Sequence, residues 1–319
     1  MADIIHGSTA RPKPELTGAF TQYDPDDNKL VAGQVMPGIP TINKAGTITY
    51  PTRAHMLRLV DTERTPGDVF GRDVIGTDST TYVCLAHGHE QKLPDEERVD
   101  FATAFNAELI KAKVARSRIL LKRETRVKDL LFNTTTWTGG TLYTDVSAAP
   151  WDAAASDAIG HVEAAFEQVI ANCGYPPNAM LVGHTTMLNL RKNTAILARI
   201  QNAVTLTQEL IQQAIAGILG VPRIIVGDAI YNSADEGLTH VGAWVWPDDY
   251  ALLGKFGTDG TRDEPCIGKT LYWTGMGKGG VAMSVYREEQ TKSDVIRAES
   301  YEVEKVFDPY FGHLLKVDV

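Results

Sequence analysis

Residues 93–133 constrain this 319-residue chain most, because their pattern predicts one unusually long helix. Pro94 is followed by three acidic residues, a typical helix start, since proline suits the first turn and carboxylates suit the positive end of the helix dipole. No glycine or proline follows until Gly139. At 1.5 Å per residue the uninterrupted helix would be roughly 50 Å long. We therefore expect a spine helix, along which other elements pack.

The spine carries more apolar surface than one small core can bury. Successive helical residues are about 100° apart, which predicts two apolar stripes on different sides of the helix. The broader stripe contains Phe101, Phe105, Leu109, Ala112, Ile119, Leu120, Val127 and Leu130, and the second contains Ile110, Val114 and Leu121. We expect protein to pack on both sides of this helix.

The spine is basic, although the whole chain has a net charge of −9. Arg116 and Arg123 lie on the side of the broader apolar stripe, where a guanidinium needs a carboxylate or phosphate partner. Candidate carboxylates lie in the segment before the spine: Asp61, Glu63, Asp68, Asp73 and Asp78. Four further basic residues line up between the two stripes, where a solvated surface is the default interpretation: Lys111, Arg118, Lys122 and Arg126.

Composition and charge exclude several classes of protein. A net charge of −9 argues against a protein that coats nucleic acid by charge alone. Cys84, Cys173 and Cys266 are widely spaced and form no C-x-x-C pair, which argues against a disulfide framework or zinc knuckle and favours a reducing compartment. The sequence has no apolar run of about 18 residues and no N-terminal signal pattern, so we expect no membrane association.

The first quarter of the chain predicts elements that cannot stabilise themselves. Residues 1–45 are rich in proline and show little periodicity, which predicts an arm that is disordered or laid across another surface. Residues 46–52 (GTITYPT) and 80–87 (TTYVCLAH) alternate as strands do, around a long charged tip. An isolated two-stranded hairpin is marginal in water. We therefore expect this hairpin to need a partner surface outside its own domain.

The rest of the chain predicts an α+β protein with one domain inserted into another. Helix and strand patterns alternate over about 110 residues after the spine, as in a compact mixed α/β domain. Residues 269–289 predict two strands about a glycine-rich turn, and the following residues alternate strongly to the end of the chain. This β segment needs a helix to cover it, and the spine is the candidate.

Two segments look like chemical motifs but lack the partners that the chemistry needs. His87, His89 and Glu90 (HGHE) could ligate a metal, yet no matching cluster lies nearby in the sequence, so a solvated loop is the better interpretation. Residues 275–280 (GMGKGG) lack the P-loop spacing and predict a hairpin turn. We predict no catalytic, cofactor or metal residues. A soluble α/β metal-dependent enzyme using the HGHE region remains a distant alternative.

Several segments, taken in order, resemble tailed-phage major capsid proteins of the Hong Kong 97 type. The resemblance covers nearly the whole chain from about Gly46, and no single motif carries it alone. The segments are ERTPG (63–67), TTYVCLAHGHEQKLPDEERVD, LLKRETRVKDLLFN, GYPPNAMLVG, AILARI, LGVPRIIVGDAIYN and GAWVWPDD. Encapsulins share this shell fold, and an encapsulin-type compartment is the first alternative.

The resemblance implies a division of the chain and a structural role. It implies an N-terminal arm (1–45), an extension loop with its lead-in (46–92), a peripheral domain (93–152 and 263–319) and an inserted axial domain (153–262). Subunits would form hexamers and pentamers that close an icosahedral head shell around double-stranded DNA. The protein would be located in the virion after assembly in the host cytoplasm, with scaffolding, portal and decoration proteins as candidate further partners.

The resemblance and the charge pattern together predict contact residues. We expect ion pairs between subunits from Arg53, Arg58, Asp61, Glu63, Arg64, Asp68, Arg72, Arg116 and Arg123. We expect non-specific contacts with packaged DNA from Lys111, Arg118, Lys122 and Arg126. Some members of the family crosslink subunits through a loop lysine. Residues 46–91 contain no lysine, so we expect no such crosslink from this loop.

Overall fold

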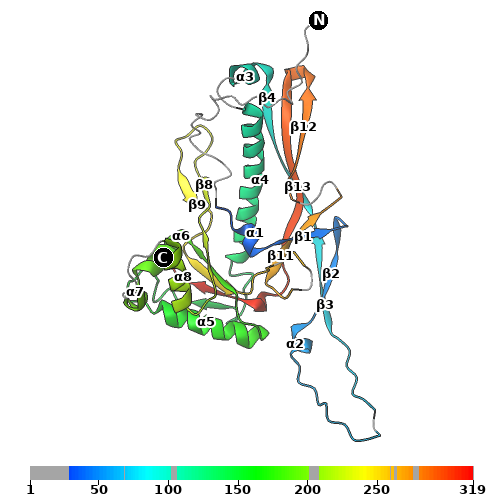
Figure 1. Cartoon of the computed structure of the whole chain (residues 1–319), viewed down its shortest axis with the longest axis vertical. Helices are drawn as coiled ribbons and strands as arrows, with labels where there is room; N and C mark the ends of the chain where they lie inside the picture. Colours follow the sequence, from blue (N-terminus) through cyan, green and yellow to red (C-terminus); the bar gives the residue numbers. More distant parts are fainter. Residues whose placement is uncertain are drawn as a thin grey trace. The chain divides into compact units, whose positions relative to one another are not determined.

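The computed structural model describes residues 29–318, except residues 68, 102–105, 201–207, 259, 262–263 and 276–279. The described residues form two compact units, whose elements are labelled in Figure 1. Unit 1 consists of His87–Leu120 and Val281–Ser300, and unit 2 consists of Lys29–Ala86, Leu121–Gly280 and the chain from Tyr301 onward. Helix α4 (Ala107–Leu131) and strand β13 (Ser293–Val306) each contribute residues to both units.

The predicted spine is two helices rather than one. Helix α3 is Asp95–Phe101 and α4 begins at Ala107, with residues 102–105 outside the described part. Asn106 is not helical, and its side-chain oxygen accepts a hydrogen bond from Leu109 N at 3.1 Å, so it caps a new helix start. With 25 residues, α4 alone corresponds to about 37 Å.

The apolar face predicted for the spine is correct in part. Ile119 and Val127 are buried, as the periodicity indicated. Leu109 is 55% exposed, so the predicted face does not continue to the start of α4. The described residues of α4 that are fully buried include Ala115 and Leu131.

Unit 1 is built on strands β4 (Leu85–Pro94), from His87 onward, β12 (Ala282–Glu288) and the first part of β13. Strand β12 pairs antiparallel with β13 from Ala282↔Glu299 to Glu288↔Ser293, around the short helix η3 (Glu289–Thr291). Strand β4 also pairs with β13. Ala115, Ile119 and Ala298 form the small apolar core of this unit.

The HGHE segment lies in strand β4 and not in the predicted loop. The Glu90 carboxylate accepts a hydrogen bond from Arg297 Nε at 2.6 Å and another from the Tyr286 hydroxyl at 3.3 Å. Burial, followed by the charge of Arg118, lowers the pKa of His89. The Glu90 side chain is thus hydrogen-bonded to one residue of β12 and one of β13.

Unit 2 contains a five-stranded sheet with the order β5-β14-β10-β6-β7. The neighbours β10 and β14, and β10 and β6, run antiparallel, while β6 and β7 run parallel. The strands are β5 (Tyr143–Asp145), β6 (Ala179–Gly183), β7 (Ile224–Gly227), β10 (Tyr250–Gly254) and β14 (Gly312–Lys316). All residues of β6 are buried.

Alternate residues of this sheet pack against different layers. Met180, Val182 and Leu253 belong to the core that the helices α5 and α8 cover. Leu181 and Leu252 belong to a second core, together with the last turns of α4. The helices of this region are α5 (Ala158–Cys173), α6 (His184–Lys192), α7 (Thr194–Ile200) and α8 (Gln208–Ile218).

The C-terminal strand occupies a place that the sequence did not predict. Residues 263–319 were expected in the peripheral domain, yet β14 pairs with β10 in the sheet of the predicted axial range. Strand β5, at residues 143–145, pairs in parallel with β14 on its other side. The division into units 1 and 2 therefore differs from the predicted domain boundaries.

The second half of the predicted arm is packed into its own chain. Helix α1 (Ala32–Val35) has two residues in the core, and β1 (Gly38–Thr41) pairs in parallel with β11 (Gly268–Trp273). Of the two expectations for the arm, disorder or a place across another surface, residues 31–41 follow the second, and the surface belongs to their own subunit. The part of the arm before residue 29 lies outside the described residues.

Strands β11 and β12 are not a hairpin, although the sequence predicted a turn between them. The order is β1-β11-β13-β12, so β13 lies between the two. Strand β11 pairs antiparallel with the second part of β13, from Gly268↔Val306 to Tyr272↔Glu302. Residues 276–279 of the predicted turn lie outside the described part.

Candidate assembly interface

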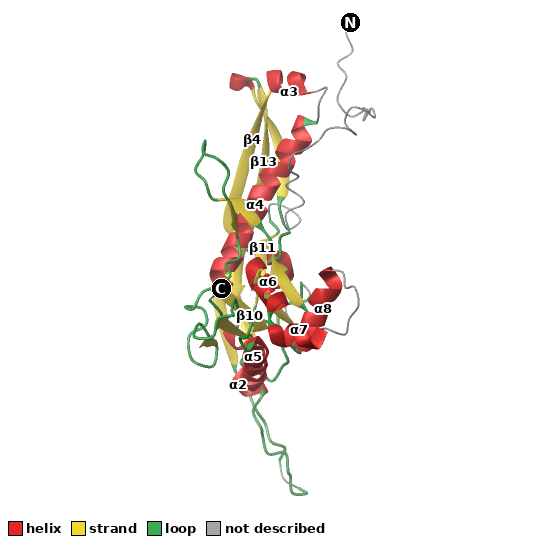
Figure 2. Ribbon diagram, turned by 90° about the vertical axis from the view of Figure 1, so that its left-hand side faces the viewer, coloured by secondary structure: helices red, strands yellow, loops and turns green. Residues whose placement is uncertain are grey.

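The range predicted for the extension loop contains an antiparallel hairpin. Strand β2 (Ala45–Pro51) pairs with β3 (Thr77–Val83) over its whole length, from Ala45↔Val83 to Pro51↔Thr77. At the end of the ladder, Thr52 N and Thr52 Oγ1 both donate to Gly76 O, at 2.8 and 3.1 Å. Residues 53–75 lie beyond this closure, and we call them the loop tip. Figure 2 shows the tip extending away from α5 as an open segment.

Several contacts within unit 2 hold the base of the hairpin. The Tyr50 hydroxyl donates to Phe307 O at 3.0 Å. The Arg53 guanidinium lies 3.7 Å from the centre of the Tyr310 ring, in the short helix η4 (Pro309–Phe311). His55 Nε2, in the short helix α2 (Arg53–Met56), lies 3.3 Å from Asp73 Oδ2 across the tip. These contacts fix where the tip starts.

The loop tip carries several large apolar side chains that are exposed in the described part of the chain. Leu59 is 98% exposed, Val74 is 85% exposed and Phe70 is 74% exposed. Burying such a side chain stabilises a protein by roughly 1.5–3 kcal/mol, so a cluster of exposed ones indicates an interaction surface. Other exposed apolar residues of the tip are Met56, Leu57, Val60 and Ile75.

Charged residues predicted at subunit contacts also lie in the tip. Arg58, Glu63 and Arg72 are exposed, and none of them has an ion pair within residues 29–318 as described. The Asp61 carboxylate accepts a hydrogen bond from Glu63 N at 3.0 Å, and Arg64 lies over the Phe70 ring at 4.1 Å. The remaining predicted member, Asp68, lies outside the described residues.

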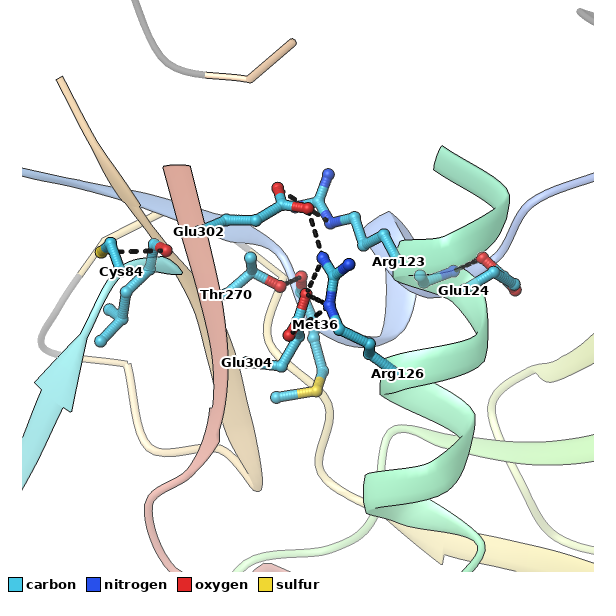
Figure 3. A network of polar contacts seen from close by, with 10 residues as sticks. Met36, Cys84, Arg123, Glu124, Arg126, Thr270, Glu302 and Glu304 are labelled. Atoms are coloured by element: carbon cyan, nitrogen blue, oxygen red, sulfur yellow. Dashed lines mark hydrogen bonds and ion pairs between the residues drawn. The ribbon is translucent and has the colours of Figure 1, made fainter. Parts of the chain in front are cut away.

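The two predicted contact residues of the spine, Arg116 and Arg123, differ in their surroundings. Arg116 is exposed on α4. Arg123 instead lies with its Nε 3.7 Å from Glu302 Oε2, within unit 2 (Figure 3). The carboxylate partner of Arg123 is therefore on β13 and not in the hairpin. Arg53 is likewise engaged in its own chain, on Tyr310.

Arg126 joins the same polar network, although the sequence predicted it to face DNA. Its Nη2 lies 2.5 Å from Glu302 Oε1, and its Nε donates to Glu304 Oε2 at 3.1 Å. The Glu302 side chain is only 1% exposed. Burial lowers the pKa of Arg126, but the hydrogen bonds and charges of Glu304 and Glu302 outweigh burial and raise it overall.

The network is expected to stabilise the subunit measurably. Arg126→Met removes the counter-charge of two buried glutamates, so we expect the free energy of unfolding to fall by about 3 kcal/mol. Lys122→Met, on the exposed side of the same helix, is the matched control and should change it by less than about 0.5 kcal/mol. Urea unfolding of unassembled subunits measures both. Equal midpoints for the two variants would contradict the prediction.

The other basic residues of the predicted DNA-facing stripe differ in their surroundings. Lys111 forms an ion pair with Glu97 and donates to Lys92 O at 2.6 Å, within unit 1. Arg118 and Lys122 are exposed, and neither has an ion pair among the residues that the structure describes. Only these two therefore keep an uncompensated charge.

Glu124 is a key residue that the sequence did not predict. It is fully buried, and its carboxylate accepts hydrogen bonds from Val31 N at 2.9 Å, Ala32 N at 2.8 Å and Trp246 Nε1 at 2.6 Å. Burial raises the pKa of Glu124, while these three donors and Arg123 act to lower it. Its partners are 92 to 122 residues away in the sequence, so no local pattern indicates them.

The described residues offer no group of three or more His, Cys, Asp or Glu side chains that could hold a metal ion. The three cysteines are free and buried, and burial raises the pKa of Cys266 to about 11. Within the described part, no helix combines the length and apolar character that crossing a bilayer requires. The prominent feature of the described residues is the set of exposed apolar side chains in the loop tip.

Two curated relatives of this chain are phage proteins, and no protein-family model matches the chain. The chain is 26% identical over 308 residues to the major capsid protein of Burkholderia phage BcepMu, a match that covers 93% of this chain and 92% of that protein. It is 24% identical over 279 residues to the major capsid protein of Pseudomonas phage JBD67, covering 84% and 85% of the two chains.

Solved structures indicate the same class. A phage-related protein from Bordetella bronchiseptica superposes with a TM-score of 0.68 at 18% identity, covering 95% of both chains. The capsid of cyanophage P-SCSP1u gives a TM-score of 0.61 at 11% identity, covering 93% of this chain and 90% of that one. An encapsulin from Synechococcus elongatus gives 0.53 at 11% identity, covering 89% and 86%.

The chain has the α+β fold of phage capsid proteins. Its homologues are major capsid proteins of Burkholderia and Pseudomonas phages, which supports a structural protein of a capsid shell. The encapsulin alternative fits less well, because both curated relatives are phage major capsid proteins.

Proposed function

We propose that copies of this chain assemble, as the major capsid protein, into the icosahedral head shell that encloses the double-stranded DNA of a tailed phage. The observation that carries this proposal is the loop tip, whose apolar side chains are exposed on a hairpin held firmly at its base. Such a surface is unfavourable in water unless another molecule covers it. A second copy of the chain is the partner that a shell supplies.

In this proposal the loop tip lies over a neighbouring subunit. Its apolar side chains supply most of the contact energy, while Arg58, Asp61, Glu63, Arg64 and Arg72 set its register by charge. Arg116 is retained as a contact residue of the spine. Arg53 and Arg123 are left out, because Tyr310 and Glu302 already engage them.

Arg118 and Lys122 are proposed to face packaged DNA with non-specific phosphate contacts. Lys111 and Arg126 are left out, since Glu97 and the pair Glu302 and Glu304 take up their charges. Hexamers and pentamers would form in the host cytoplasm and persist in the virion. Scaffolding, portal and decoration proteins are the further partners such a shell would use.

Expression of the chain alone, followed by sedimentation and negative-stain electron microscopy, tests the proposal. We expect closed particles of uniform size, because many weak contacts per subunit make a closed shell stable through multivalency. A compact monomer under all assembly conditions would count against a shell protein. Portal and terminase genes beside the coding gene would favour a phage head, whereas a gene for an enzyme cargo would favour a cellular compartment.

A further inference from the structure

Unit 2 contains a second hairpin, and most of its residues are exposed in the described part of the chain. Strands β8 (Ile230–Asn232) and β9 (Gly242–Trp244) pair antiparallel, and all their residues except Ala243 are exposed. A two-stranded hairpin has little stability in water unless one face is covered. We call residues 230–244 the axial hairpin.

The axial hairpin is anchored at its base and ordered at its end. His184 stacks on Trp244, with ring centres 4.2 Å apart and planes at 12°, and His184 Nδ1 lies 2.7 Å from Asp228 Oδ1. Asn232 Oδ1 accepts hydrogen bonds from Ala234 N and Val241 N, at 3.2 and 2.9 Å. The connection is thus a defined structure able to present a fixed surface.

That surface is apolar and acidic. Tyr231, Leu238 and Val241 are large exposed apolar residues. Asp235 and Glu236 are exposed beside them, and residues 224–254 contain no lysine or arginine at all. A partner should therefore offer apolar contact together with positive charge.

A complementary surface lies on α6 and α7 of the same chain. Leu188 is exposed on α6 one turn before Arg191 and Lys192, and the spacing places all three on one side of the helix. Leu197 and Arg199 are exposed on α7. Residues 184–200 contain no acidic residue. We call these five residues the basic helical surface.

In the described residues, the side chains of Asp235 and Glu236 form no ion pair, and the same holds for Arg191, Lys192 and Arg199. Two complementary patches at different places on one molecule form a heterologous contact, which closes a ring when it is repeated by rotation.

We propose that the axial hairpin of one subunit docks on the basic helical surface of the next copy of this chain, and that this contact closes the capsomer ring. The inference rests on the proposed function and extends it to a named pair of surfaces. Apolar contacts supply affinity, and the opposite charges select the register and exclude contacts between like surfaces.

Reversing the charge on each side tests the docking. The first variant is Asp235→Lys with Glu236→Lys, and the second is Lys192→Glu with Arg199→Glu. We expect each to lower the yield of rings and shells at least ~10-fold, because like charges then face each other. Glu163→Lys and Arg223→Glu, exposed charges of unit 2 outside both surfaces, are matched controls and should leave the yield unchanged.

Mixing the two reversed chains distinguishes a contact between copies from an effect within one chain. In the mixture each reversed hairpin meets a reversed helical surface, so we expect six-membered rings to return to within ~3-fold of the wild-type yield. Circular dichroism checks that both chains are folded, and alanine at the same positions replaces any reversed variant that is not.

Two outcomes overturn the docking while leaving the shell function intact. Either the reversals leave the yield of wild-type-like shells unchanged, or folded reversed chains fail to recover on mixing. Absence of shells from the wild-type chain itself would instead contradict the proposed function, and the docking inference would fall with it.

Discussion

Replacing Leu59, Phe70 and Val74 by serine is expected to leave the subunit folded and to abolish shell formation. All three side chains are exposed in the loop tip, so they contribute little to the folded subunit. Burial of each in an interface contributes roughly 1.5–3 kcal/mol, and the loss recurs at every subunit of a shell. Negative-stain microscopy measures assembly, and thermal unfolding measures the stability of the subunit.

A matched control separates this effect from a general change in surface polarity. Ile42 is 85% exposed and lies outside the loop tip, in the turn between β1 and β2, so Ile42→Ser should assemble like the wild type. Shells of normal yield from the triple variant would show that the tip does not carry the subunit contact.

Glu124→Ala is expected to destabilise the subunit by about 5 kcal/mol, because three hydrogen-bond donors lose their acceptor and a cavity remains. Val31 N, Ala32 N and Trp246 Nε1 are all buried with Glu124, and water does not replace the lost carboxylate easily there. Such a loss is comparable to the whole stability of many domains. We therefore expect little soluble protein, and a lowered urea midpoint for any that is recovered.

Glu124→Gln and Glu108→Ala complete this experiment. Glutamine keeps the size and one acceptor oxygen but directs an NH2 group at a donor, so its loss of stability should lie between those of alanine and wild type. Glu108 is exposed in the first turn of the same helix, and its replacement should change stability by less than about 1 kcal/mol. A soluble Glu124→Ala chain with the wild-type midpoint would contradict the role assigned to this carboxylate.

The extension loop was predictable because its signals are local. The alternation of residues in β2 and β3 indicates strands, and the charged intervening segment excludes a buried connection. The buried strand β6 and the helix ending at Cys173 follow from short-range periodicity in the same way. The identity of the capsid class also rested on the order of such segments along the chain.

The break between α3 and α4 shows the limit of periodicity. The apolar pattern does not identify Asn106 as the end of a helix. Asparagine is a poor helix former, but a helix can still contain it. In the folded chain Asn106 takes the cap position that asparagine prefers, and its side-chain oxygen accepts a hydrogen bond from Leu109 N. A new helix therefore begins after it. A short stretch of sequence does not show whether a helix ends and a new one is capped at Asn106 or the helix continues through it. That depends on which parts of the protein pack against the residues before and after it.

The partners of the spine charges could be guessed only from a pattern that spans the chain. Arg123 and Arg126 are three residues apart on a helix, and Glu302 and Glu304 alternate on one side of a strand, so the two pairs match in spacing. The acidic residues of the hairpin looked equally suitable, because charge alone does not identify which carboxylate lies near a given arginine in the folded chain.

The sequence by itself determined the strands of the hairpin, many of the other helices and strands, and the resemblance of the chain to phage capsid proteins. Only the tertiary structure decided that residues 31–41 complete their own subunit and that β14 joins the sheet of β6 and β10. The physical reason is the range of the forces concerned. Periodicity and caps act within a few residues, whereas strand pairing and buried hydrogen bonds such as those of Glu124 join residues far apart, whose proximity exists only after folding.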